Sequence, residues 1–224
     1  MTSPPAAHPI GVFDSGIGGL SVLQALRHEL PHEQFVYLAD SGNAPYGDAR
    51  GDAFVQERSL AIAQYLLEQH DIKILVIACN TATALAIEYL RAAYPKQKFI
   101  GIEPMIKTAA ELTKGKIVAV CATPATLASS RYAMLVQKYG SHLTILEPDC
   151  SEWAYWIENN QVNREHIAEI INNVCEQGAD VIVLGCTHYH WIKELIIELA
   201  AGRATVIEPS EAIGRRVQEL LELR

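Results

Sequence analysis

Short β-branched and aliphatic runs recur along the chain at regular intervals, and they constrain its fold more than any other feature. Most of these runs are apolar throughout, which is typical of strands that are covered on both faces. Stretches with apolar residues at three- and four-residue spacing lie between them and predict helices. We expect eight strands, over residues 10–13, 35–39, 74–78, 99–102, 117–121, 143–146, 181–185 and 205–207. The alternation of strand and helix predicts an α/β protein with parallel sheets and crossover helices.

An internal echo indicates how the 224 residues are divided. Residues 73–81 resemble residues 180–188, because each segment is an apolar strand that runs into a cysteine, then into polar side chains and a helix. The length alone leaves a single eight-stranded barrel open, whereas the echo favours two similar lobes. We expect a first lobe of residues 1–97 plus 208–224 that carries Cys79, and a second lobe of residues 98–207 that carries Cys186. Each lobe is expected to be a mainly parallel sheet flanked by helices, with the active site in the cleft between the lobes.

Composition excludes several classes of function. Eighteen basic and 26 acidic residues give a formal charge of −8, with no basic stripe, so no nucleic-acid partner is expected. No apolar run approaches the ~20 residues that span a bilayer, so no membrane association is expected either. Residues 1–9 lack the basic start and apolar core of a signal peptide and are expected to form a frayed lead-in. Five cysteines without a CxxC pair fit a reducing cytoplasm.

Two cysteines follow predicted strands directly, and this position gives them potential chemistry. A cysteine just before a helix lies near unpaired backbone N–H groups and the positive end of the helix dipole, which favour the thiolate. Cys79 and Cys186 share this predicted setting. Cys121, Cys150 and Cys175 do not, and they are expected to be inert, since free cysteine usually packs as a small hydrophobe.

Polar loops follow other predicted strands, at residues 14–19, 40–47 and 123–126. Their backbone N–H groups and hydroxyls suit a carboxylate or a phosphate. Neither GxGxxG nor GxxxxGK[ST] occurs, which argues against a nucleotide. Asp14 and Asp40 in these loops could equally be helix caps or turn residues. No metal is expected, because HExxH and a cysteine cluster are both missing from the sequence. His188 is interpreted as a polar partner of the Cys186 thiol, and His190 as a surface histidine.

Five motifs in order carry a resemblance to a known family. They are residues 13–22 (FDSGIGGLSV), 45–47 (PYG), 78–83 (ACNTAT), 101–104 (GIEP) and 185–189 (GCTHY). From about Pro9 to its C-terminus the sequence resembles the cofactor-independent glutamate racemases of the aspartate/glutamate racemase superfamily. The resemblance implies two similar α/β lobes with the active site between them, and so argues against the barrel. The chain departs from the family pattern at Ser151 and His190, where proline is usual.

The resemblance also implies roles for individual residues. Cys79 and Cys186 match the two catalytic acid/base thiols, with Cys79 acting on the D-enantiomer and Cys186 on the L-enantiomer. The implied substrate contacts are Asp14, Ser15, Tyr46, Gly47, Asn80, Thr81, Thr187 and His188. Three further positions match the pocket less closely: Thr123, Thr126 and Glu158.

The implied activity is the interconversion of L- and D-glutamate by proton transfer at the α-carbon, without a cofactor. The substrate is then a small molecule, and the implied cellular role is to supply D-glutamate for peptidoglycan. Relatives often pair, so a homodimer is one open arrangement.

Other functions stay open on the residues alone. An aspartate racemase, or another cysteine-based isomerase, would use the same scaffold. A cysteine hydrolase could use Cys186 with His188, and a non-catalytic dicarboxylate-binding protein would keep the polar loops but tolerate loss of the thiols. A pyridoxal-type enzyme would need a Schiff-base lysine, and neither Lys107 nor Lys193 lies at a predicted strand end.

Overall fold

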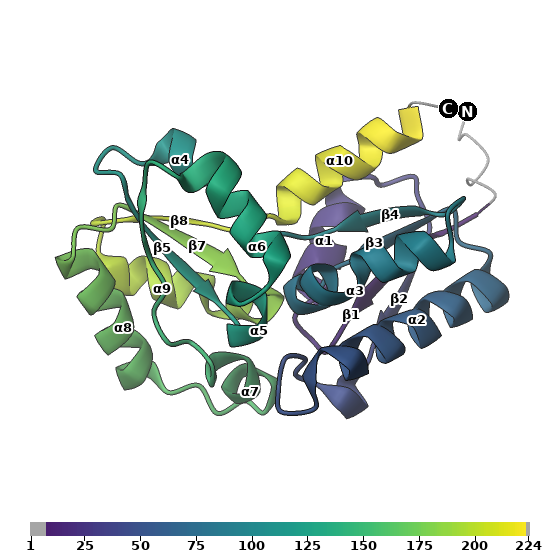
Figure 1. The fold of residues 1–224 in the computed structure, drawn as a ribbon, viewed down its shortest axis with the longest axis horizontal. Helices are drawn as coiled ribbons and strands as arrows, with labels where there is room; N and C mark the ends of the chain where they lie inside the picture. Colours follow the sequence, from purple (N-terminus) through teal and green to yellow (C-terminus); the bar gives the residue numbers. More distant parts are fainter. Residues whose placement is uncertain (1–7, 223–224) are drawn as a thin grey trace. The chain divides into compact units, whose positions relative to one another are not determined.

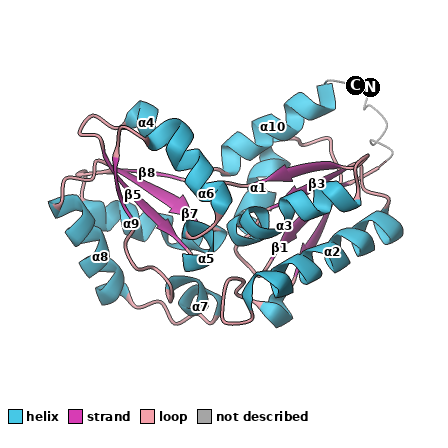
Figure 2. Cartoon of the chain, in the orientation of Figure 1, coloured by secondary structure: helices cyan, strands magenta, loops and turns pink. Residues whose placement is uncertain are grey.

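The computed structural model describes residues 8–222 (Figure 1). Residues 1–7 of the lead-in expected over residues 1–9 lie outside the described residues. The chain divides into two compact units, one running to Ile102 and resuming at Pro209, the other comprising Glu103–Glu208. Each unit holds one four-stranded parallel sheet with helices around it (Figure 2).

The sheet of the first unit has the strand order β2-β1-β3-β4, and all its pairings are parallel. Its strands are β1 (Ile10–Asp14), β2 (Phe35–Ala39), β3 (Ile74–Ile77) and β4 (Lys98–Gly101). Its helices are α1 (Leu20–Glu29), the short 3₁₀ helix η1 (Ser41–Asn43), α2 (Gly51–His70), α3 (Asn80–Ala93) and α10 (Ser210–Glu222).

Successive side chains of the central strands enter two separate cores. Val12 and Val76 pack with apolar residues of α1 and α10 on one face of the sheet. Phe13 and Ile77 pack with α2 and α3 on the other face. Because neighbouring residues of a strand point to opposite faces, β3 and the part of β1 before Asp14 must be apolar at every position. This explains the continuous runs in the sequence.

The second unit repeats this plan with the strand order β6-β5-β7-β8, again parallel throughout. Its strands are β5 (Ile117–Ala122), β6 (Thr144–Leu146), β7 (Val181–Gly185) and β8 (Thr205–Ile207). Its helices are α4 (Ile106–Leu112), α5 (Pro124–Leu127), α6 (Ser130–Leu135), the π-helical turn η2 (Val136–Gly140), α7 (Trp153–Glu158), α8 (Arg164–Glu176), the 3₁₀ helix η3 (Thr187–Ile192) and α9 (Lys193–Ala200).

The predicted α/β fold with two parallel sheets is confirmed, and the single barrel that the length left open does not form. All eight expected strands are present, each with ends within one residue of the expected ones. In each unit the first strand lies between the second and the third, so successive crossovers leave it in opposite directions. Such a reversal opens a crevice at the carboxyl ends of the two middle strands, where open α/β sheets bind ligands.

The boundary between the units differs from the expected one. The first unit runs to Ile102 rather than to residue 97, because β4 pairs with β3 from Ile74↔Lys98 to Ile77↔Gly101 and so completes the first sheet. The chain returns from the second unit to the first after Glu208, rather than after residue 207 as expected.

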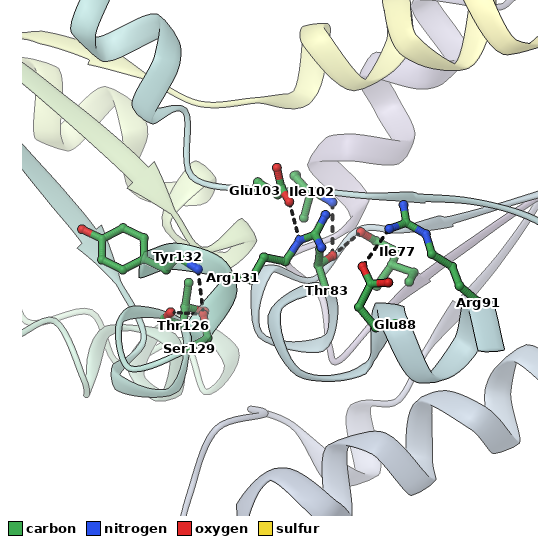
Figure 3. Close-up of polar contacts among 10 residues, drawn as sticks. All are labelled: Ile77, Thr83, Glu88, Arg91, Ile102, Glu103, Thr126, Ser129, Arg131 and Tyr132. Carbon is green, nitrogen blue, oxygen red and sulfur yellow. Dashed lines mark hydrogen bonds and ion pairs between the residues drawn. The ribbon is translucent and has the colours of Figure 1, made fainter. Parts of the chain in front are cut away.

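Thr83 and Gly101 hold β3, α3 and β4 together at the end of the first sheet, and Figure 3 shows Thr83 between Ile77 and Ile102. The Thr83 hydroxyl donates to the carbonyl of Ile77 at 3.3 Å and accepts from the amide of Ile102 at 3.1 Å. A Cβ at Gly101 would lie 2.4 Å from Thr83 Cγ2 and 2.7 Å from Ile87 Cδ1. The approach of α3 to β4 therefore requires glycine at this position.

Gly101→Ala should lower the free energy of unfolding by about 1–3 kcal/mol, the usual cost of overpacking a core. Urea denaturation measures the change. Gly42→Ala is the matched control, because a Cβ there meets nothing within 4 Å, and it should change stability by less than about 0.5 kcal/mol. Adding Thr83→Ser removes the nearest clashing methyl and should restore part of the loss. Equal stability of the two alanine variants would contradict this role of Gly101.

His190 was expected on the surface, and this prediction is wrong. Its side chain is only 3% exposed, and Nδ1 lies 3.6 Å from Glu208 Oε2. Burial lowers the pKa of His190 to about 4, although the nearby Glu208 acts in the opposite direction. His190 lies within η3, which turns its side chain inward. No local sequence pattern predicts this orientation.

Buried His190 should make stability depend on pH. The unfolded chain binds a proton at this histidine below about 6.5, whereas the folded chain resists protonation down to about 4. The free energy of unfolding should therefore fall as pH decreases from 6.5 to 4. In His190→Gln this part of the dependence should vanish in urea unfolding series across that range. The exposed His142 provides the control substitution His142→Gln, and a wild-type pH dependence in His190→Gln would refute the assignment.

Candidate active site

The expected reactive cysteines lie at equivalent positions in the two sheets. Cys79 follows β3, one of the two middle strands of the first sheet, after the single residue Ala78. Cys186 follows β7 directly, which is the corresponding middle strand of the second sheet. Each thiol thus lies at the edge where its own sheet has its topological switch point.

Cys79 caps the N-terminus of α3 with its sulfur. Its backbone is extended (φ −118°, ψ 121°), and Sγ accepts a hydrogen bond from the amide of Ala82 at 3.4 Å. The thiol also lies 3.6 Å from the hydroxyl oxygen of Ser15. A backbone N–H and a hydroxyl near the sulfur, at the positive end of a helix, stabilise negative charge on it.

Asp14 and Ser15 end β1 beside this cysteine. Asp14 is fully buried, and its Oδ1 accepts from the amide of Gly16 at 2.8 Å in an Asx turn, the turn role that the sequence left open. Gly19 of the same loop lies close to Asp14 and Tyr37, since a Cβ at this position would lie 2.5 Å from Asp14 Cβ and 2.9 Å from Tyr37 Oη. The glycines of this motif therefore bring a carboxylate and a hydroxyl to the strand end.

Asn80 has an unsatisfied amide. The residue is 3% exposed, and within residues 8–222 neither its Nδ2 nor its Oδ1 has a hydrogen-bond partner. Buried side-chain polar atoms are nearly always bonded, so an unsatisfied pair beside a candidate thiol indicates a place for a ligand or a water. Thr81, the next residue, is also buried at the start of α3.

Tyr46 and Gly47 lie in the loop after β2. The Tyr46 hydroxyl donates to Asp40 Oδ2 at 2.6 Å, and its ring packs against Phe13 with centroids 6.2 Å apart. Burial and the bond to Asp40 raise the pKa of Tyr46 well above its ordinary value. Gly47 adopts φ +94°, a conformation that favours glycine.

Cys186 lies in a different environment from Cys79. Its backbone is extended (φ −146°, ψ 132°), but its side chain caps no helix, and the helix that follows is the six-residue 3₁₀ segment η3 rather than the expected α-helix. Its Sγ lies 3.9 Å from Nδ1 of His188, as expected for a polar partner. Nε2 of His188 lies 2.6 Å from Oε2 of Glu158 at the end of α7. A sulfur, an imidazole and a carboxylate thus form a chain within the second unit.

Aromatic packing fixes η3 and α7 to one another, and with them this chain of groups. Tyr189 is fully buried and donates its hydroxyl to the carbonyl of Cys150 at 2.7 Å. Its ring meets that of Trp153 edge-on, with centroids 5.2 Å apart. His188 on η3 and Glu158 on α7 are therefore held by rigid neighbours.

Thr123 and Thr126 lie after β5, the other middle strand of the second sheet. Thr123 caps α5, because its Oγ1 accepts from the amide of Thr126 at 3.3 Å and donates to the Thr126 hydroxyl at 3.0 Å. Ser129 then donates to the Thr126 carbonyl and caps α6 by accepting from the amide of Tyr132 (Figure 3). Thr187 is buried beside Cys186. The expected pocket residues of the second unit therefore all lie at or near strand ends of its sheet, except Glu158, which α7 supplies.

The remaining cysteines fit an inert role. All five cysteines are free thiols. Cys121 and Cys150 are buried, and Cys175 is half-buried on α8. Burial raises the pKa of both Cys150 and Cys175, which disfavours their thiolates at neutral pH.

Sequence reasoning missed two residues that support the candidate site. Asp40 follows the second strand and was interpreted as a possible cap or turn residue, whereas its carboxylate binds Arg58 and Tyr46. Arg58 lies inside α2 with no motif around it. Charge complementarity with Asp40 was the only available signal, and the sequence does not reveal which arginine meets which carboxylate.

Within residues 8–222, no group of three or more histidine, cysteine, aspartate or glutamate side chains is arranged to hold a metal ion. Within the same range, no helix combines the length and the apolar character needed to cross a bilayer.

Comparison with known proteins assigns the chain to a family. The model of the Asp/Glu/Hydantoin racemase family matches residues 19–215. The glutamate racemase of Pseudomonas syringae pv. tomato is 40% identical over 223 residues, which cover 98% of this chain and 80% of that protein.

Two solved structures are similar over 96% of the chain. The Escherichia coli glutamate racemase, in complex with L-glutamate and the activator UDP-MurNAc-Ala, has a TM-score of 0.87 at 31% identity and is covered over 83% of its length. The Francisella tularensis glutamate racemase, in complex with D-glutamate, has a TM-score of 0.81 at 31% identity and is covered over 80%. The chain therefore belongs to the Asp/Glu/Hydantoin racemase family and is an amino-acid racemase.

Proposed function

We propose that this racemase interconverts L- and D-glutamate through Cys79 and Cys186, without a cofactor. The observation that carries the proposal is the equivalent placement of two buried cysteines, each at the end of a middle strand of its own sheet. The relatives support the choice of substrate, since one bears the name glutamate racemase at 40% identity and solved relatives hold L-glutamate or D-glutamate.

Racemisation removes the α-proton from one face of the carbon and returns a proton to the opposite face, so it requires two acid/base groups. In our proposal the Cys79 thiolate takes the proton from D-glutamate, and the Cys186 thiol donates its own proton to the other face. L-glutamate is formed, with Cys79 left as thiol and Cys186 as thiolate. The reverse reaction starts from that state, with Cys186 as the base.

Different neighbours support the two thiols. The amide of Ala82 stabilises charge on the Cys79 sulfur, and the Ser15 oxygen, which accepts from the thiol, can turn its hydroxyl to donate once that thiol has lost its proton. On the other side, a Glu158 carboxylate accepts a hydrogen bond only from a protonated Nε2 of His188, which leaves Nδ1 facing Cys186. In this arrangement His188 can take up the proton of the Cys186 thiol, and Glu158 stabilises the imidazolium that forms.

The α-proton of an amino-acid carboxylate is weakly acidic, so the developing negative charge needs fixed donors. The Asn80 amide, with its unsatisfied buried atoms, is our first candidate for a substrate contact. Ser15, Thr81 and Thr187 are the other proposed donors. Further proposed substrate contacts are Asp14, Tyr46, Gly47 and His188, and Thr123 and Thr126 belong to the further pocket. A preorganised donor in such a site is worth about 2.7–4 kcal/mol.

The finer biological assignment is part of the same proposal. We infer that the enzyme acts in the cytoplasm and supplies D-glutamate for peptidoglycan, with a homodimer as one arrangement. Aspartate is the competing substrate, because one methylene changes selectivity by only ~1–3 kcal/mol.

Isotope exchange tests the activity directly. L-glutamate incubated with the enzyme in D2O, without added cofactor, should gain deuterium at Cα and lose optical rotation. Mass spectrometry and polarimetry follow the two changes, and L-aspartate in a parallel reaction measures selectivity. Retention of both protium and rotation would exclude the racemase and leave the dicarboxylate-binding protein, whereas faster exchange with aspartate would reassign the substrate.

Substitution of each thiol tests the two-base mechanism. Cys79→Ser and Cys186→Ser should each lower kcat by at least about 10²-fold, the usual contribution of a positioned acid or base. Cys175→Ser is the matched control, because this half-buried thiol on α8 lies away from both strand ends, and it should keep wild-type kcat. Circular dichroism checks the fold. Full activity in either strand-end variant would rule out the mechanism.

A further inference from the structure

The loop after β2 contains two of the proposed substrate contacts but little regular structure. Between η1 and the start of α2 at Gly51, residues 44–50 form no helix or strand. Tyr46 and Gly47 lie in this stretch. A loop of this kind is mobile unless specific contacts hold it, so the precision of any substrate contact here depends on what holds it.

The buried carboxylate of Asp40 binds side chains on the inner side of the loop. Asp40 is 7% exposed, and its two oxygens accept hydrogen bonds from Tyr46 Oη at 2.6 Å and from Asn43 Nδ2 at 3.1 Å. Arg58 of α2 binds the same carboxylate through both ends of its guanidinium, with Nε–Oδ2 at 2.9 Å and Nη2–Oδ1 at 2.8 Å. Bidentate pairing of this type combines strength with a fixed orientation.

The charge of Arg58 keeps this carboxylate ionised. Burial acts to raise the pKa of Asp40, but the hydrogen bonds from Arg58, Tyr46 and Asn43 outweigh it, and the pKa lies below its ordinary value. An ionised Asp40 accepts from Tyr46 and Asn43 at once. Without the cation, a carboxylate buried to this degree would be costly and would favour its neutral form.

Arg50 binds the same loop from its outer side. Its Nη2 donates to the carbonyls of Asn43 at 2.6 Å and Pro45 at 3.1 Å, and its Nε binds Asp48. The guanidinium also lies over the ring of Phe54, 4.2 Å from its centroid. Arg50 reaches the loop through the backbone carbonyls of Asn43 and Pro45 and through Asp48, whereas Arg58 reaches the side chain of Tyr46 through Asp40. Loss of Arg58 therefore removes the inner support of the loop and leaves the contacts of Arg50 in place.

The geometry points to Arg58 as a positioning residue for the racemase reaction, which acts through Asp40 to hold Tyr46 and Gly47 against the substrate. The inference rests on the proposed function, because it assumes that these two residues contact glutamate. Arg58 itself touches no reacting atom in this assignment. A lysine at the same site supplies one point charge in place of a two-point fork and replaces it only in part.

Kinetics and hydrogen exchange of three variants test this role. Arg58→Met should raise KM for both enantiomers at least about tenfold, with a smaller effect on kcat, because interactions made in both ground and transition states are weakened. Arg58→Lys should recover part of the loss. Backbone exchange in residues 41–47 should be faster in Arg58→Met than in wild type. Arg164→Met is the control, since it breaks the exposed Arg164–Glu198 pair at 2.7 Å and should change neither KM nor exchange.

Three outcomes would overturn the inference: wild-type KM in Arg58→Met, a loss of activity that follows only the loss of folded protein, or unchanged exchange in residues 41–47. Failure of the proposed function would look different. Wild-type enzyme would then racemise neither glutamate nor aspartate, which removes the substrate role. The exchange measurement would still show whether Arg58 holds the loop.

Discussion

The chemistry of this chain depends on a constraint of parallel sheets, whose middle strands are buried on both faces. β3 is apolar and buried at all four of its positions, and β7 at all five. No polar side chain can function along such a strand, so chemistry begins just beyond its end. At the switch point the helices that leave the two middle strands diverge, and their first turns present unpaired N–H groups. Cys79 and Cys186 occupy these positions.

The backbone at these ends is fixed by side-chain contacts with strict size limits. Thr83 bonds both Ile77 and Ile102, and Gly101 admits the threonine methyl. In the second unit, Thr123 and Ser129 cap successive short helices after β5. Several motif residues therefore position the backbone, and the thiols depend on them indirectly.

Periodicity was sufficient to predict the strands, because a residue that enters either core must be apolar and the run itself marks the strand. It could not predict strand order, which depends on contacts distant in sequence. The boundary expected at residue 97 was early for this reason, since β4 joins the first sheet through its pairing with β3. The echo between residues 73–81 and 180–188 was the informative signal, because two equal strand ends imply two equal sheets.

The residues that sequence reasoning missed or misplaced are held by long-range polar contacts. Arg58 meets Asp40 across 18 positions, and any of several arginines could have been its partner. His190 is buried beside Glu208 although its neighbour Trp191 is largely exposed, which no local pattern reveals. The pocket residues were predicted from motifs, and a motif gives the residue types of a site without the distant contacts that hold them in place.

The two units share a topology but surround their cysteines differently. Cys79 caps a 14-residue α-helix and meets a hydroxyl, whereas Cys186 precedes a short 3₁₀ helix and meets an imidazole that is paired with Glu158. A repeated scaffold alone would make the thiols equivalent, and a pair of identical thiols has no preferred resting state. Under the proposed mechanism one sulfur must be charged while the other carries a proton, and then the roles exchange. In that proposal the amide of Ala82 supports charge at Cys79 and His188 exchanges a proton with Cys186, so the unequal neighbours supply the asymmetry that the equal sheets lack.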